Sequence, residues 1–167
     1  TIILALAASV SLISCLKQNV DDSPALSGGC ADGSYNWSTI ADTAEMSLDY
    51  FWSPSGKYYL SSNTSSDWAQ YWPQAHALDV LTDAYLRNPS TTIKAKMNDL
   101  LTGVRAKNGG SWINYYYDDM EWMALACLRA YTATNDSRFK GVTDTLWADI
   151  RNGWSDDLGG GIWWRKD

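Results

Sequence analysis

At residues 115–131 the sequence reads YYYDDMEWMALACLRAY. Apolar and small residues recur in it at spacings of three and four, among them Met123 and Cys127, and this is the period of a helix with one face in a core. Two adjacent acids, Asp118 and Asp119, stand where the helix begins. The pattern therefore predicts a helix that carries a pair of carboxyl groups in its first turn.

The same period recurs along the chain from about Ser38 onward, with turn signals between the segments. It predicts helices at residues 38–52, 72–87, 91–107, 118–134 and 137–152. No segment has the alternating pattern of a strand. Helices that alternate with aromatic loops favour an all-α fold, an array of helical hairpins in which each pair buries its inner face against its neighbours.

Composition excludes several classes of function. The chain has 167 residues, a formal net charge of −6 and no cluster of Lys and Arg, which argues against a nucleic-acid partner. A single histidine, His76, and three cysteines without a C-x-x-C pair argue against a metal site. No phosphate-binding loop or dinucleotide fingerprint is present, so we expect no cofactor. The unusual feature is the 10 tryptophans, because large exposed rings are often used for binding.

The first residues are typical of an export signal. Residues 1–14 are apolar or small and uncharged, too short to span a bilayer as a helix, and the basic start of such a signal is missing before Thr1. The segment that ends in Cys15 resembles a bacterial lipobox, in which the cysteine receives lipid. A buried strand or helix that happens to hold a cysteine is the alternative. The polar residues 15–36 favour a tether, and we expect an exported bacterial lipoprotein at the outer membrane or cell surface.

The acid pair has two interpretations. Asp118 is a good helix N-cap, with Glu121 three residues later completing a capping box. A cap needs only one acid, however, and a second carboxyl beside it under aromatic rings adds repulsion and desolvation, which separate the two pKa values. One ionised and one protonated carboxyl are what a retaining glycosidase requires as nucleophile and general acid/base.

Three blocks of sequence resemble glycoside hydrolase family 76, the endo-α-1,6-mannanases. They are DWAQYWPQAHALDVLTDAY, YYDDMEWMALACLRAY and the terminal DDLGGGIWWRKD, in the family's order. The resemblance implies an (α/α)6 barrel of twelve helices in which Asp118 is the nucleophile and Asp119 the acid/base. Five helices cannot close that ring, so we expect residues 37–167 to be the N-terminal part of a catalytic domain.

Sugar clefts favour aromatic platforms with polar partners, because sugar rings have apolar faces edged by hydroxyl groups. Residues of these types near the proposed cleft are the candidate sugar contacts: Trp72, Gln74, Tyr117, Trp163 and Trp164. For each, a role in the core or in a cap is the alternative. His76 is interpreted as a structural histidine, and no G-x-S-x-G motif supports a serine nucleophile.

Together these observations predict a monomeric, lipid-anchored, retaining endo-mannosidase that cleaves α-1,6-mannan without a metal. One alternative is a helical surface lipoprotein that binds glycans without cutting them. Another is a related hydrolase or transglycosylase that acts on a different α-linked glycan.

Overall fold

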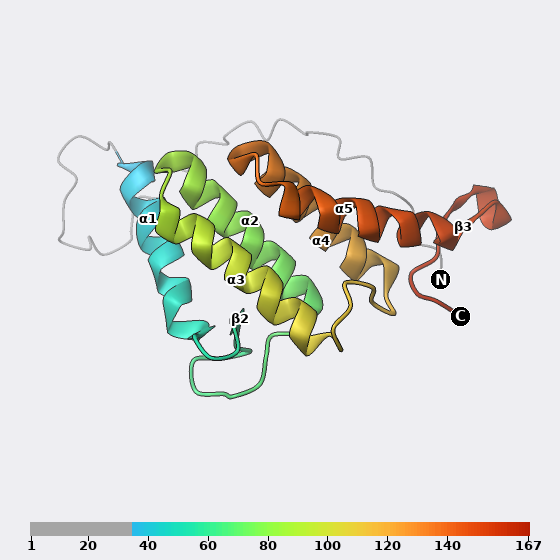
Figure 1. Ribbon diagram of the computed structural model, residues 1–167, viewed down its shortest axis with the longest axis horizontal. Coiled ribbons are helices and arrows are strands. Elements are labelled where there is room, and N and C mark those ends of the chain that lie inside the picture. Colours follow the sequence, from blue (N-terminus) through green and yellow to red (C-terminus); the bar gives the residue numbers. More distant parts are fainter. Residues whose placement is uncertain (1–34) are drawn as a thin grey trace, which may run out of the picture.

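A computed structural model describes residues 35–167 of the chain (Figure 1). The signal segment 1–14, the lipidation candidate Cys15 and nearly all of the tether lie outside the described residues. Five α-helices account for most of the described part: α1 (Trp37–Ser47), α2 (Tyr71–Arg87), α3 (Thr91–Lys107), α4 (Tyr117–Thr134) and α5 (Ser137–Ile150). The all-α class expected from the sequence is confirmed, and four of the five helices lie within two residues of their predicted limits.

The first predicted helix and the absence of strands need correction. The predicted helix 38–52 ends as an α-helix at Ser47 and continues as the 3-10 helix η1 (Leu48–Phe51). Two short antiparallel pairs follow in the chain: β1 (Trp52–Ser53) pairs with β2 (Tyr58–Tyr59), and β3 (Trp154–Ser155) pairs with β4 (Gly161–Ile162). Two-residue strands are too short for an alternating pattern, so the sequence gives no sign of them.

The 3-10 helices η2 (Arg151–Gly153) and η3 (Asp157–Gly159) complete the secondary structure near the end of the chain. The 3-10 helix η2 leads into β3, and η3 lies in the turn between β3 and β4. This hairpin extends beyond the end of α5, on the right in Figure 1.

The helices form the predicted array of hairpins. α2 contacts α1, α3 and α4, and α4 also packs along α5. Because successive helices reverse direction, α2 and α4 run the same way and their N-terminal ends lie together. Residues 117–119 and 71–72 therefore meet at one end of the array.

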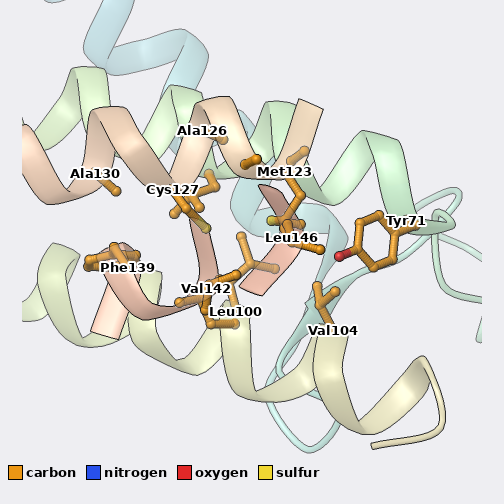
Figure 2. Packing of buried hydrophobic residues seen from close by; sticks show 14 of the residues in the cluster. Tyr71, Leu100, Val104, Met123, Ala126, Cys127, Ala130, Phe139, Val142 and Leu146 are labelled. Carbon is orange, nitrogen blue, oxygen red and sulfur yellow. The ribbon is translucent and has the colours of Figure 1, made fainter. Parts of the chain in front are cut away.

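The core lies between the α2–α4 pair and the helices α3 and α5. Figure 2 shows Leu100 of α3, Met123 and Cys127 of α4, and Phe139 and Leu146 of α5 in one cluster, all fully buried. Burying a side chain of this size contributes roughly 1.5–3 kcal/mol to the free energy of folding. The shared cluster therefore stabilises the packing of the four helices.

Side chains on the opposite side of α2 and α4 are exposed although many are apolar. They are Trp72, Val80 and Leu86 of α2, and Trp122, Leu125 and Leu128 of α4. No helix among residues 35–167 is long and apolar enough to cross a membrane.

Candidate active site

The acid pair lies in the first turn of α4. Tyr116, in an extended conformation, is the N-cap residue, its side chain makes no capping hydrogen bond, and Asp118 and Asp119 are already helical. The capping-box alternative is therefore wrong, because Asp118 does not occupy the cap position. The helix dipole favours negative charge in this turn whatever the chemical role of the pair.

Asp118 is held by donors from two directions. Its Oδ1 accepts the backbone N–H of Asp119 at 2.9 Å, and its Oδ2 accepts the indole N–H of Trp164 at 3.0 Å. Both carboxyl oxygens therefore have a hydrogen-bond partner within the described residues.

Asp119 has a different environment. Burial, and after it the negative charge of Asp118, raises the pKa of its carboxyl from 3.8 to about 6. The Tyr71 hydroxyl donates to the carbonyl of Trp112 at 2.7 Å, and its pKa is raised by burial first and then by the nearby Cys127 and Asp119 groups. Burial and the neighbouring charge thus favour the protonated form of Asp119, which is the form that a general acid needs.

Glu121 adds a third carboxyl in the same part of α4. Its pKa is raised by burial and then by the charge of Asp118. Three carboxyl groups therefore lie close together at this end of the helix, and ionisation of two of them is disfavoured.

A row of three rings lies on the exposed side of α2 and α4, and its Trp122 comes one helical turn after Asp118. Trp72 contacts His76 at a ring-centroid distance of 5.5 Å, and His76 contacts Trp122 at 4.9 Å. Both tryptophans are about half exposed. Sequence reasoning selected Trp72 and treated His76 as structural. The spacing of four from Trp72 to His76 and from Asp118 to Trp122 is the signal that puts these side chains on one face.

A pocket of about 600 Å³ opens beside the acid pair. Its walls include Tyr117, Gly153, Trp163 and Trp164, so three of the predicted sugar contacts line it. Asp118 and Asp119 are not part of this lining, and the indole of Trp164 connects the pocket wall to the pair. Tyr117 is largely buried because its ring fills the space beside Gly153.

Gln74 is not available to a sugar in this structure. Its side chain is fully buried, its Oε1 accepts the backbone N–H of Tyr59 at 2.9 Å, and its Nε2 donates to the Tyr59 carbonyl at 2.8 Å. The amide thus binds strand β2 to α2. The expectation of a sugar contact for Gln74 is corrected to a structural role, because both of its polar atoms are already used.

An ionic clamp connects α2 and α4 on the same exposed side. Arg129 donates to Asp79 at 2.6 Å and to Asp83 at 2.5 Å. Partly exposed ion pairs of this kind each contribute little to the free energy of folding. Together the two bonds connect the same sides of α2 and α4 through one side chain. Among the described residues, no group of three or more His, Cys, Asp or Glu side chains could hold a metal ion.

Comparisons with known proteins agree with the fold. No protein-family model and no curated protein matches the chain, but solved structures do. The GH76A α-1,6-mannanase from Salegentibacter sp. HEL1_6 is 39% identical, with a TM-score of 0.75, over 79% of this chain and 39% of that one. The described residues have the fold of glycoside hydrolase family 76. They correspond to part of its (α/α)6 barrel, as the sequence resemblance implied.

Two further structures support the comparison. An inactive variant of the Salegentibacter mannanase, with two adjacent aspartates replaced and α-1,6-mannotriose bound, is 37% identical over 79% of this chain and 39% of that one, with a TM-score of 0.75. The Lin0763 protein from Listeria innocua is 32% identical over 79% of this chain and 40% of that one, with a TM-score of 0.67. The chain thus spans about two fifths of the length of these solved structures.

Proposed function

We propose that this chain belongs to a retaining, endo-acting member of glycoside hydrolase family 76 that cleaves the α-1,6-linked backbone of mannan. The observation that carries the proposal is the contrast within the pair. Asp118 has a donor on each oxygen, whereas the pKa of Asp119 is raised to about 6 by burial and by the charge of Asp118. The two residues have the properties of a nucleophile and of a general acid/base, respectively.

In the proposed reaction Asp118 is the nucleophile and Asp119 the general acid/base. An oxygen of Asp118 attacks the anomeric carbon while the proton of Asp119 moves to the departing glycosidic oxygen, so the C1–O bond breaks and a covalent glycosyl–enzyme ester forms. Asp119, now ionised, removes a proton from water as the water attacks the same carbon. Asp118 leaves as a carboxylate, and the product keeps its anomeric configuration.

The choice of substrate rests on the family relatives. The inactive Salegentibacter variants were solved with α-1,6-mannotriose and with α-1,6-mannotetrose. In this chain the half-exposed rings of Trp72 and Trp122 lie near the N-terminal ends of α2 and α4, the end that carries the acid pair, and provide apolar faces for successive sugar rings. Trp163, on the wall of the adjoining pocket, offers a further face.

We further propose that residues 37–167 are the N-terminal part of the catalytic domain. The exposed apolar side of α2 and α4 supports this division, because in a closed ring of helical hairpins that side faces the interior. The remaining helices of the ring would then complete the cleft above the acid pair.

The test uses the full-length protein and linear α-1,6-mannan. Asp118→Asn and Asp119→Asn should each abolish cleavage while binding of α-1,6-mannotriose persists. The exposed neighbours Asp156 and Asp157 provide a matched control, because they are also adjacent acids and lie outside the first turn of α4. Cleavage by both pair variants would overturn the catalytic assignment.

Product analysis separates the remaining alternatives. Proton NMR of the first product should show the α-anomer. A β-anomer would mean inversion at the anomeric carbon and would contradict the role of Asp118 as nucleophile. Cleavage of another α-linked glycan, with no products from mannan, would overturn the proposal that α-1,6-mannan is the substrate. Mannan binding without hydrolysis by the wild type would identify the glycan-binding lipoprotein instead.

We also propose that the protein is exported and anchored through lipid on Cys15, with its catalytic domain at the cell envelope. The apolar residues 1–14 and the lipobox-like segment before Cys15 support this. Labelled palmitate should be incorporated into the wild type and into a Cys30→Ala variant, but not into Cys15→Ala. Equal labelling of both variants would contradict the anchor. Gel filtration of the delipidated protein should give a monomer.

A further inference from the structure

Trp164 reaches the acid pair from a distant part of the chain. It follows β4, 46 residues after Asp118, and its indole N–H donates to Oδ2 of Asp118 at 3.0 Å. The other oxygen, Oδ1, accepts the backbone N–H of Asp119. With a donor fixed on each oxygen, the carboxylate plane of Asp118 cannot rotate without breaking one of the two bonds.

The backbone holds the indole in this position. The N–H of Tyr117 donates to the carbonyl of Trp164 at 2.9 Å, and the N–H of Lys166 donates to the carbonyl of Tyr115 at 3.1 Å. These bonds pair the segment after β4 antiparallel to the residues that enter α4. The donor and the helix turn that carries the carboxylate are therefore parts of one hydrogen-bonded unit.

Packing on the indole ring adds to this restraint. The ring of Tyr116 lies 5.3 Å from that of Trp164, and the Arg165 guanidinium lies 5.7 Å from the centroid of the same indole. Such contacts restrict the indole to one orientation. They also occupy part of the ring surface that a sugar would need for stacking.

We propose that Trp164 is a positioning residue for Asp118 rather than a sugar platform: its N–H fixes the carboxylate in the orientation for attack on the anomeric carbon. This inference rests on the proposed function. It gives Trp164 a different role from that of Trp163, whose backbone N–H binds the carbonyl of Gly153 and for which the structure gives no contact with the pair.

Asp119 benefits from the same contact. A carboxylate that is fixed beside it presents its negative charge at a constant place, and that charge is one of the two causes that raise the pKa of Asp119. Loss of the indole donor should therefore change both the attack and the proton donation, with less effect on sugar binding.

The kinetic test compares two substitutions in the full-length protein. Trp164→Phe keeps an aromatic ring but removes the indole N–H together with one of the two fused rings, so kcat on α-1,6-mannan should fall roughly 10- to 100-fold while KM changes less than twofold. Trp154→Phe is the matched control. The Trp154 indole also donates to an aspartate, Asp156, at 3.0 Å, but this bond lies on the β3–β4 hairpin away from the pair. It should keep kcat and KM within twofold of the wild type.

Two kinetic results would overturn the proposal. An unchanged kcat in Trp164→Phe would show that the hydrogen bond does not position the nucleophile. A raised KM with an unchanged kcat would assign Trp164 to sugar binding.

A second test does not depend on catalysis. In the full-length protein, the indole N–H resonance of Trp164 should shift when Asp118 is replaced by Asn, and that of Trp154 should not. If the Trp164 resonance stays in place, the contact is absent and the proposal fails. If it shifts but the wild type does not cleave mannan, the positioning contact stands and the proposed function fails.

Discussion

The backbone N–H of Asp119 donates to the carboxylate of Asp118 at 2.9 Å, so the two acids are connected through the first turn of α4. Burial of the Asp119 carboxyl, and after it the negative charge of Asp118, disfavours ionisation of Asp119. Burial is the larger cause of the raised pKa, so the surroundings of Asp119 matter more to its proton than the repulsion between the two acids.

Replacing Asp119 by Asn should stabilise the protein at neutral pH. The pKa of Asp119 in the folded protein is about 6, above its ordinary value of 3.8, so the folded state binds the proton more tightly between these values. Wild-type stability from this group therefore falls as pH rises from about 4 to 6. The full shift corresponds to about 3 kcal/mol, and partial exposure of the carboxyl reduces this to roughly 1 kcal/mol.

Urea unfolding of the 167-residue chain at pH 4 and pH 7 measures this effect. Asp119→Asn should gain stability over the wild type at pH 7 and much less at pH 4. Asp157→Asn, at an exposed acid on the hairpin, should change stability little at either pH. An equal gain for Asp119→Asn at both values would show that ionisation of Asp119 is not its source.

The activity of the full-length protein should decline on the alkaline side of about pH 6. Asp119 must carry a proton to protonate the leaving oxygen, and above its pKa of about 6 the protonated fraction falls tenfold per pH unit. The logarithm of kcat/KM on α-1,6-mannan should therefore approach a slope of −1 above that pH. A profile that is flat to pH 8 would be incompatible with Asp119 as the acid.

Local signals explain which parts of the fold were predictable. The helix predicted at 91–107 is observed as Thr91–Lys107 because both of its ends are marked nearby. The Ser90 hydroxyl accepts the N–H groups of the first turn, and Gly109 after the last turn has a φ of 71°. Capping residues at the ends of a helix can be recognised in the sequence because they lie next to the helix in the chain.

The unpredicted features depend on contacts between distant residues. The bond from Trp164 to Asp118 joins residues 46 positions apart, and no spacing in the sequence indicates it. Gln74 beside Trp72 has the composition of a sugar site, but the polar partner that takes its amide is the backbone of β2, a strand too short to predict. The acid pair could be proposed from the sequence because its two carboxyl groups belong to consecutive residues, so the proposal needs no contact between distant parts of the chain.

Replacing glycine by alanine should have opposite effects on stability at Gly103 of α3 and at Gly141 of α5. A Cβ on Gly103 of α3 would lie 2.0 Å from the carbonyl oxygen of Lys57, so the β1–β2 turn must move, at a cost of about 2–4 kcal/mol. A Cβ on Gly141 of α5 meets no atom within 4 Å. Alanine there should stabilise the helix by about 0.5–1 kcal/mol. Urea midpoints of the two variants check this, and similar midpoints would contradict the close approach at Gly103.

Gln74→Leu should destabilise the protein by about 2–3 kcal/mol. Leucine has a similar size, but it leaves the buried N–H of Tyr59 without the acceptor that Gln74 provides, while the Tyr59 carbonyl still receives the N–H of Ala69. The loss should also loosen the β1–β2 hairpin, so amide hydrogen exchange of residues 52–60 should accelerate more than that of α5. Gln70→Gly is the control, because Gln70 is exposed and has a φ of 63° that glycine adopts without strain. It should leave stability unchanged or slightly higher. If Gln74→Leu instead kept full stability and lost affinity for α-1,6-mannotriose, the side chain would be a sugar ligand and the buried arrangement would be wrong.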